Sequence, residues 1–151
     1  RPLLVELQAL VSSSPYGTPR RTTIGIDPNR LALLVAVLEK KVGLHLGGQD
    51  IFLNVAGGVK LGEPAVDLGT VVALASSHLD RPVEPQTLFL GEVGLTGEVR
   101  GISQPELRIR EAAKLGFTRC LLPAGSVKQV KVKGVELVGV ESVAQALEGL
   151  F

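Results

Sequence analysis

The sequence predicts an α/β or α+β domain in which helices pack on a mixed β-sheet. Short apolar or alternating runs, typical of strands, are interspersed with longer segments that carry helix caps. Hydrophobic residues make up 45% of the 151 residues, but aromatic residues only 3%. The core must therefore consist mainly of Leu, Val, Ile and Ala, and the length suits one domain over residues 1–151.

Two strands and a buried helix are expected first. Residues 3–11 alternate between apolar and polar side chains, and residues 22–26 form a second strand. The loop between them, 12–19, is rich in Ser, Pro and Gly. Asp27 can cap the next helix, in which residues 31–38 are almost entirely apolar. This helix should be largely buried.

The middle of the chain predicts a strand, a turn, a helix and a hairpin. Residues 51–56 form the strand and lead into Gly57-Gly58. A helix should then run from Pro64 to about His78, because proline is favoured in a first helical turn. Residues 87–92 and 98–100 should form the two arms of a hairpin.

The last third predicts two helices and two strands. Ser103 can cap a helix over 104–115, and the apolar run 118–122 predicts a buried strand. Residues 130–133 alternate strictly between valine and lysine, which predicts a strand with a lysine face. A short helix over 142–150 completes the domain.

Composition limits the possible functions. With 16 basic and 15 acidic residues the formal charge is +1, so nucleic-acid binding would require a local basic cluster. The lone Cys120 lies in an apolar run and is expected in the core rather than as a nucleophile. His45 and His78 stand alone, so no metal site is expected in this domain.

No run of transmembrane length and no signal peptide is found, which favours a cytoplasmic location and no membrane partner. The absence of an initiator Met suggests a domain excised from a longer chain. The turn at 57–62 is rich in glycine but lacks the Gly-Lys-Ser/Thr ending of a P-loop, so we expect no nucleotide site here.

The run 58–69 resembles the segment of Lon-type proteases that carries their serine nucleophile. Counting forward without gaps places 89–99 on the Thr-Gly-Glu hairpin of that family and 102–110 on the start of its lysine-bearing helix. In this register Ala65 replaces the serine and Glu106 replaces the lysine. Alanine has no hydroxyl with which to attack, so the resemblance implies a domain without the protease chemistry.

Three further runs resemble the C-terminal domain of the RadA/Sms family of bacterial RecA-like DNA repair and recombination ATPases. They are Glu-Pro-Ala-x-Asp-Leu at 63–68, Gly-Glu-Val-Gly-Leu-x-Gly-Glu-x-Arg at 91–100 and Glu-Ala-x-Lys-Leu-Gly-Phe at 111–117. Shorter upstream matches lie at 20–21, 25–31, 34–40 and 54–58.

The resemblance implies a Lon protease proteolytic-domain-like fold, with zinc-finger and RecA-like ATPase regions upstream. ATP, magnesium and zinc would be used there, with no cofactor in this domain. The implied partners are DNA, the upstream ATPase domain, further copies of the chain in a hexameric ring, and recombinase or replication proteins.

Lys60 and Arg100 are the leading candidates for DNA contact, because each projects from a loop or hairpin end near the former catalytic region. Arg20 and Arg21 can add a second phosphate contact. Ordinary surface charge or an intersubunit salt bridge is the alternative for all four. The lysines of 128–133 are expected to protect a strand edge from aggregation rather than to bind DNA.

Two other functions stay open. The domain could be a purely structural oligomerisation module without DNA affinity, or a peptidase with an unrecognised nucleophile, for which Ser76-Ser77 is a remote candidate. Glu63 and Asp67 lie four residues apart and could pair for acid-base chemistry. Capping and stabilisation of the helix dipole near the N-terminus are the preferred interpretation of these two carboxylates.

Overall fold

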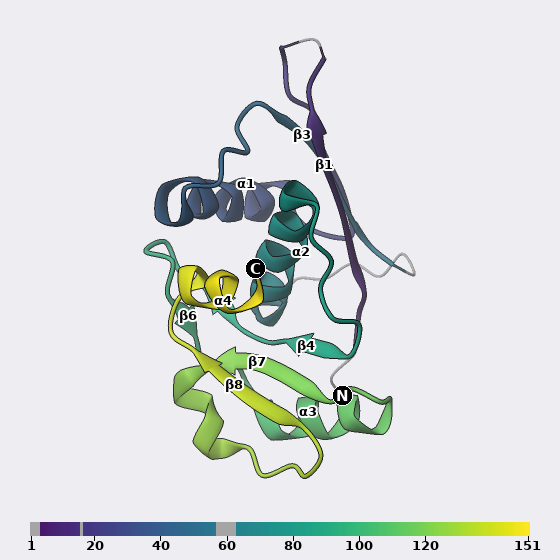
Figure 1. Ribbon diagram of the computed structural model, residues 1–151, viewed down its shortest axis with the longest axis vertical. Coiled ribbons are helices and arrows are strands. Elements are labelled where there is room, and N and C mark those ends of the chain that lie inside the picture. Colours follow the sequence, from purple (N-terminus) through teal and green to yellow (C-terminus); the bar gives the residue numbers. More distant parts are fainter. Residues whose placement is uncertain (1–3, 16, 57–62) are drawn as a thin grey trace.

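The computed structural model describes residues 4–15, 17–56 and 63–151 (Figure 1). The strands are β1 (Leu7–Ser13), β2 (Arg21–Ile24), β3 (Gln49–Val55), β4 (Thr87–Phe89), β5 (Glu92–Val93), β6 (Val99–Arg100), β7 (Arg119–Pro123) and β8 (Glu136–Val140). The α-helices are α1 (Pro28–Val37), α2 (Asp67–Leu79), α3 (Pro105–Lys114) and α4 (Val143–Leu150). Shorter helical turns are η1 (Leu38–Val42), η2 (Pro64–Val66) and η3 (Ala124–Gln129).

In the described part of the chain, the strands form three sheets. The first has the order β1-β3-β2, with β1 antiparallel and β2 parallel to β3. The second has the order β4-β7-β8 and is parallel, and β5 with β6 forms a small hairpin. The α+β fold class with a mixed sheet is confirmed, although the strands are divided among separate sheets.

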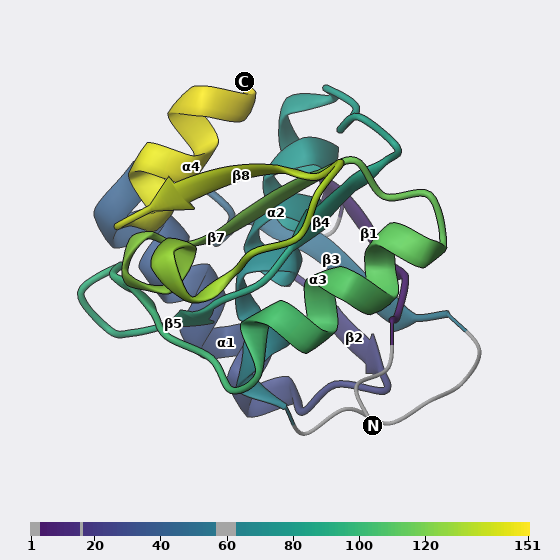
Figure 2. The ribbon, with the colours of Figure 1, turned by 90° about the horizontal axis from the view of Figure 1, so that it is seen from below.

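The helices cover the sheets and enclose two apolar clusters. In Figure 1, α1 and α2 lie on one side of the first sheet, with α4 beneath α1. The larger cluster includes residues of β3, α1, α2 and α4. Figure 2 shows α3 in front of the second sheet, where the smaller cluster joins Ile109 of α3 to Leu90, Cys120 and Leu122.

The predicted cap of α1 is confirmed, and Ser142 caps α4 in the same way. The Asp27 carboxylate accepts a hydrogen bond from the Asn29 N–H at 2.9 Å, and the Ser142 hydroxyl accepts one from the Gln145 N–H at 3.0 Å. These side-chain acceptors satisfy N–H groups that a helix leaves free in its first turn. The buried face of α1 is also confirmed, with Leu31 and Leu34 each 1% exposed.

Two local predictions were wrong. Residues 130–133 are not a strand, since η3 precedes them and Gly134 turns the chain with φ of +83° before β8. Ser103 does not cap α3, because the N-cap residue is Gln104 in a left-handed conformation, and the Ser103 hydroxyl accepts from Arg108 at 3.1 Å instead. In both places other contacts outweighed the local pattern.

Candidate functional site

Ala65 is buried beside a cleft of about 910 Å³. It lies in η2, where its carbonyl accepts a hydrogen bond from the Gly91 N–H at 3.1 Å. Residues of β1, of α2 and of the segment leading into β4 also line this cleft. The residue at the predicted nucleophile position thus presents a methyl group, which has no nucleophilic atom.

Glu106 lies in the first turn of α3 and has structural partners. Its carboxylate accepts a hydrogen bond from the Lys131 N–H at 3.0 Å and lies 3.5 Å from the Arg110 guanidinium. The α3 side chain that lines the cleft together with Ala65 is Arg108, which forms an ion pair with Glu63. The two predicted dyad positions therefore lie on the expected elements, but Arg108 faces the cleft.

The sequence holds a signal that could have identified Arg108. The buried residues of α3 are Pro105, Ile109 and Ala112, which mark one face of the helix. Position 108 lies three residues from Pro105 and four from Ala112, whereas position 106 has this spacing to Ile109 alone. The arginine side chain is only 11% exposed and needs its carboxylate partner.

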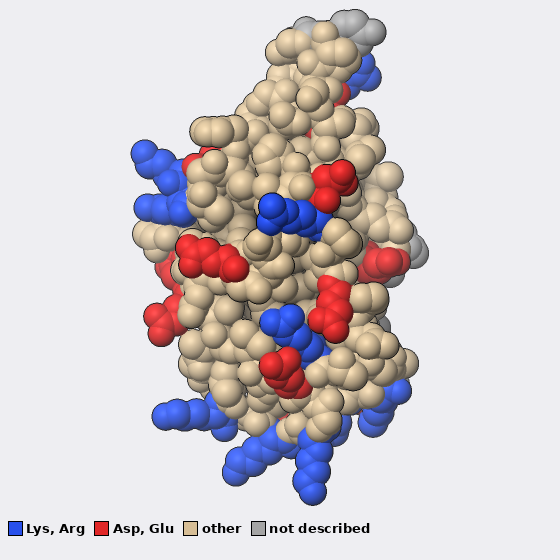
Figure 3. Space-filling model, viewed as in Figure 1, with Lys and Arg blue, Asp and Glu red and all other residues tan. Residues whose placement is uncertain are grey.

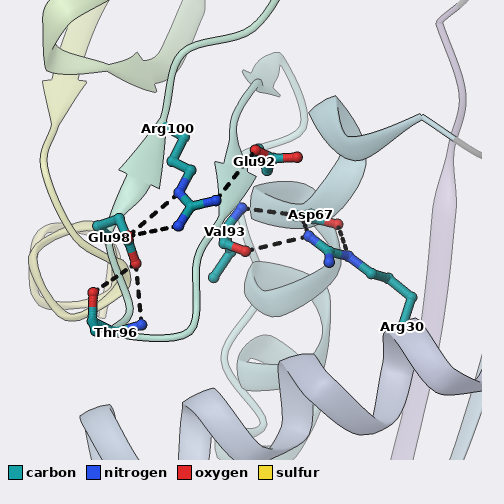
Figure 4. A network of polar contacts seen from close by, with 7 residues as sticks. All are labelled: Arg30, Asp67, Glu92, Val93, Thr96, Glu98 and Arg100. Carbon is teal, nitrogen blue, oxygen red and sulfur yellow. Dashed lines mark hydrogen bonds and ion pairs between the residues drawn. The ribbon is translucent and has the colours of Figure 1, made fainter.

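The Asp67 carboxylate joins three elements and is 1% exposed (Figure 4). It accepts hydrogen bonds from Arg30 Nε at 2.9 Å and from the Val93 N–H at 3.0 Å. Arg30 also donates to the Val93 carbonyl at 3.2 Å. The bond to Asp67 raises the pKa of Arg30, burial opposes this rise, and the negative charges of Asp67 and Glu92 add to it. Asp67 thus anchors β5 to α1 and α2.

The predicted side-chain capping by these carboxylates is wrong, although Asp67 does lie in the first turn of α2, where a negative charge suits the helix dipole. Neither η2 nor α2 has a side-chain hydrogen bond at its N-cap. Glu63 pairs with Arg108, and Asp67 pairs with Arg30 and Val93. Both carboxylates have structural partners from distant elements, which sequence spacing cannot reveal.

The β5–β6 hairpin is held together by Glu98. Its carboxylate accepts from the Thr96 hydroxyl at 2.7 Å, from the Thr96 N–H at 3.1 Å and from Arg100 Nη2 at 3.0 Å. The bond from the Thr96 hydroxyl is the largest cause that lowers the pKa of Glu98 to about 2, with backbone and Arg100 bonds adding to it. Glu98 therefore keeps its negative charge near neutral pH.

Arg100 lies between two carboxylates and still reaches solvent. Its side chain is 54% exposed, with Glu98 on one side and Glu92 at 3.9 Å on the other (Figure 4). Because hydrogen bonds from Thr96 restrain the Glu98 carboxylate, the guanidinium is presented from a rigid support. The flanking negative charge would weaken its attraction for a phosphate.

The other predicted DNA contacts lie elsewhere or outside the described residues. Arg20 and Arg21 are exposed at the start of β2, with the Arg21 guanidinium donating to the Leu46 carbonyl at 3.2 Å. This strand belongs to a different sheet from the Arg100 hairpin. Lys60 lies outside the described residues. Of the three predicted contacts that are described, only Arg20 and Arg21 are adjacent, as sequence neighbours.

The structure bears on two further predictions, the position of Cys120 and the metal site. Cys120 is buried, and burial raises the pKa of its thiol to about 12, which confirms the core interpretation. Across residues 4–15, 17–56 and 63–151, no group of three or more His, Cys, Asp or Glu is arranged to hold a metal ion. Within the same residues, no helix has the length and apolar character required to cross a bilayer.

The chain matches curated DNA repair proteins along nearly its whole length. It is 57% identical over 148 residues to "DNA repair protein RadA" of Bacillus subtilis, a match that covers 97% of this chain and 32% of the relative. Proteins of the same name from Streptococcus pyogenes and Listeria monocytogenes are each 51% identical, over 100% and 98% of the chain. The chain is homologous to part of RadA.

The chain spans about a third of the length of these RadA proteins. No family model matches it. The resemblance to RadA that was drawn from short runs is confirmed over nearly the whole chain. The Lon-type relationship and the ring stay predictions.

Proposed function

We propose that the chain is a non-proteolytic, Lon-protease-like domain of a cytoplasmic DNA repair and recombination protein, where it contacts DNA and assembles into a ring. The observation that carries the proposal is 49 to 57% identity, over nearly the whole chain, to proteins named DNA repair protein RadA. The remaining two thirds of such a protein would hold the zinc-finger and ATPase regions, with ATP, magnesium and zinc.

Arg100 supports a role in DNA contact, because an exposed guanidinium on a restrained hairpin can neutralise a phosphate at little cost in conformational entropy. Lys60, Arg20 and Arg21 would add further phosphate contacts. Figure 3 shows additional Lys and Arg side chains that protrude at the lower end of the molecule. The exposed lysines before β8 are Lys128, Lys131 and Lys133. Such contacts are salt-dependent and independent of sequence.

The absence of protease chemistry is supported by what surrounds the cleft. Ala65 has no hydroxyl, and the two serines that line the cleft form hydrogen bonds with backbone groups. The Ser76 hydroxyl donates to the Arg81 carbonyl at 2.5 Å, and the Ser77 oxygen accepts from the Val11 N–H at 2.9 Å. A peptidase would need a serine activated by a neighbouring base.

Ring assembly is supported by an exposed apolar face on the first sheet. Leu10, Phe52 and Ile24, one from each strand, are 56%, 42% and 57% exposed. Apolar side chains clustered on one sheet face favour contact with another protein surface. This observation also favours the second candidate function, an oligomerisation module without DNA affinity. In a ring, weak phosphate contacts repeated in each subunit would combine into avid binding.

Sedimentation velocity and fluorescence anisotropy with labelled single-stranded and duplex DNA test the proposal together. We expect a concentration-dependent oligomer that binds DNA, with affinity falling as salt is raised. An oligomer that binds neither single-stranded nor duplex DNA at low salt would instead support the oligomerisation module without DNA affinity. A monomer with no DNA affinity would contradict both functions.

A further inference from the structure

The cleft beside Ala65 is elongated and exceeds the length of a single side chain. It is lined by residues 4–9, which lead into and form the first part of β1, by one face of α2 from Gly69 to Ser77, and by the segment after α2. In Figure 1 this segment runs back from the end of α2 to β4. At 1.5 Å per residue, the stretch of α2 spans roughly 12 Å, the length of about four extended residues.

β1 is an edge strand of its sheet, and one side of its backbone faces away from β3. The Glu6 carbonyl accepts from the Ala56 N–H at 2.9 Å, so even-numbered residues bond towards β3. The Val11 N–H instead donates to the Ser77 hydroxyl oxygen, so odd-numbered residues face the other way. By this alternation the N–H and C=O groups of Leu7 and Ala9 point to the other edge of β1, which pairs with no strand among the described residues.

The same residues of β1 lie along α2. A Cβ at Gly69, near the start of the helix, would lie 3.4 Å from Leu7 Cδ1, and at the other end Ser77 bonds to Val11. Strand and helix therefore run side by side in the same direction. The helix presents the small residues Gly69 and Ala73 to the cleft, which leaves room over the strand edge.

Thr87 gives a second, independent indication of a ligand. It lines the cleft and is 7% exposed, and its hydroxyl oxygen is buried with no hydrogen-bond partner in the described part of the chain. Buried hydroxyl groups without a partner are uncommon, because losing their hydrogen bonds to water costs stability. The hydroxyl oxygen is itself shielded from solvent, so a ligand carbonyl or N–H in the cleft would supply the missing bond after the Thr87 side chain rotates towards it.

We propose that this cleft binds an extended, mainly apolar peptide segment of a partner protein, which adds as a strand to the free edge of β1 and bonds to Thr87. Strand addition provides main-chain hydrogen bonds at every second residue, which suits the free groups of Leu7 and Ala9. Apolar peptide side chains would pack on Val72 and Phe89, which also line the cleft. The Arg108–Glu63 pair lies in the same lining and restricts which charges the peptide can carry there.

A peptide explains these features better than an apolar small molecule does. The edge offers an alternating series of donors and acceptors, which a hydrocarbon or an aromatic compound cannot satisfy. The inference needs neither DNA binding nor ring assembly, so its test is separate from that of the proposed function.

The test begins with selection from a random heptapeptide phage library on the immobilised chain. An enriched peptide is then synthesised with a fluorophore, and its binding is measured by anisotropy. Two further versions of this peptide carry backbone N-methyl groups at every second residue. One version is methylated at the odd-numbered residues and the other at the even-numbered residues, which gives the two possible phases. We expect one phase to lose binding by at least about fivefold and the other to retain it, because only one side of an added strand bonds to β1.

Protein variants locate the site. Ala9→Pro removes an N–H at the free edge without removing a bond to β3, and Thr87→Val removes the hydroxyl at nearly constant volume. Ala73→Leu fills the cleft from α2 if Ala9→Pro fails to fold. Each should weaken peptide binding, while Leu115→Ala, an exposed position at the end of α3 that does not line the cleft, should not. Circular dichroism confirms the fold of each variant.

Hydrogen exchange gives a second measurement on the unmodified chain, since the bound peptide should slow exchange at Leu7 and Ala9. The inference is overturned if no peptide is enriched, if both N-methyl phases bind equally, or if Ala73→Leu and Thr87→Val bind as well as the parent chain. Equal binding of both phases with lost binding in Ala73→Leu would indicate an apolar ligand site without strand addition.

Discussion

The buried carboxylate of Asp67 is held by the guanidinium of Arg30, and this pair joins α1 to the start of α2. The same carboxylate binds the Val93 N–H and so fixes the hairpin that carries Arg100. A structural ion pair thus determines where the leading DNA-contact candidate lies.

Replacement of Arg30 by Met should destabilise the fold by about 2 to 4 kcal/mol, because a buried carboxylate without its cation retains its desolvation cost. The free energy of unfolding in urea measures this. Arg110→Met removes an exposed arginine from an ion pair and should change stability by less than about 1 kcal/mol. Equal effects of the two substitutions would refute the structural role of the Arg30–Asp67 pair.

Glu98 should titrate well below an ordinary glutamate. Its pKa of about 2 lies under the usual 4.5, so its bonds add stability that is present above pH 4.5 and lost as pH falls through about 2. Carboxyl carbon chemical shifts measure this pKa. Thr96→Val removes the hydroxyl donor and should move the pKa upward, whereas Thr118→Val, an exposed threonine outside the hairpin, should not. An unchanged value in Thr96→Val would contradict the assigned cause.

Cys120 should react with thiol reagents only when the chain unfolds. Burial raises its pKa to about 12, so the thiol is protonated and shielded near neutral pH. Above pH 9 the unfolded state loses the thiol proton before the folded state does, so stability should fall as pH rises. Labelling by a disulfide reagent, with and without denaturant, measures the reactivity of the thiol. Rapid labelling of the native chain would place Cys120 at the surface.

Introducing a hydroxyl at position 65 should not create a protease. In Ala65→Ser the new serine would share its cleft with Arg108, and arginine cannot accept a proton in a protein. A fluorophosphonate probe should therefore leave both this variant and the parent unlabelled, as followed by mass spectrometry. Labelling of Ser76 or Ser77 in the parent chain would revive the peptidase interpretation.

The order of the elements follows from local pattern, whereas the environment of the site depends on contacts between distant segments. Asp27 was predicted as a cap because the N–H group that it binds lies only two residues away. The ion pair of Arg108 was not predicted, because its partner Glu63 is 45 residues distant. Helix spacing could only have placed Arg108 near the inner face of α3.

The strict alternation of valine and lysine at residues 130–133 wrongly predicted a strand, for a similar reason. Val130 is buried in the smaller core cluster, and the Lys131 N–H bonds to Glu106 of α3, so tertiary contacts and not strand pairing hold this segment. Ala65 lies beside a cleft, in η2 directly before α2, and the register that matches it to a protease serine stays a prediction.

The central claim, DNA contact through the Arg100 hairpin, is tested most directly by anisotropy of labelled DNA across a salt series. The parent chain is compared with Arg100→Ala and with Glu92→Gln, which removes a flanking negative charge 3.9 Å from the guanidinium. We expect Arg100→Ala to bind more weakly, with a salt slope smaller by about one for each phosphate that it no longer neutralises, and Glu92→Gln to bind more tightly. Equal DNA affinity and equal salt slopes for all three proteins would contradict the claim.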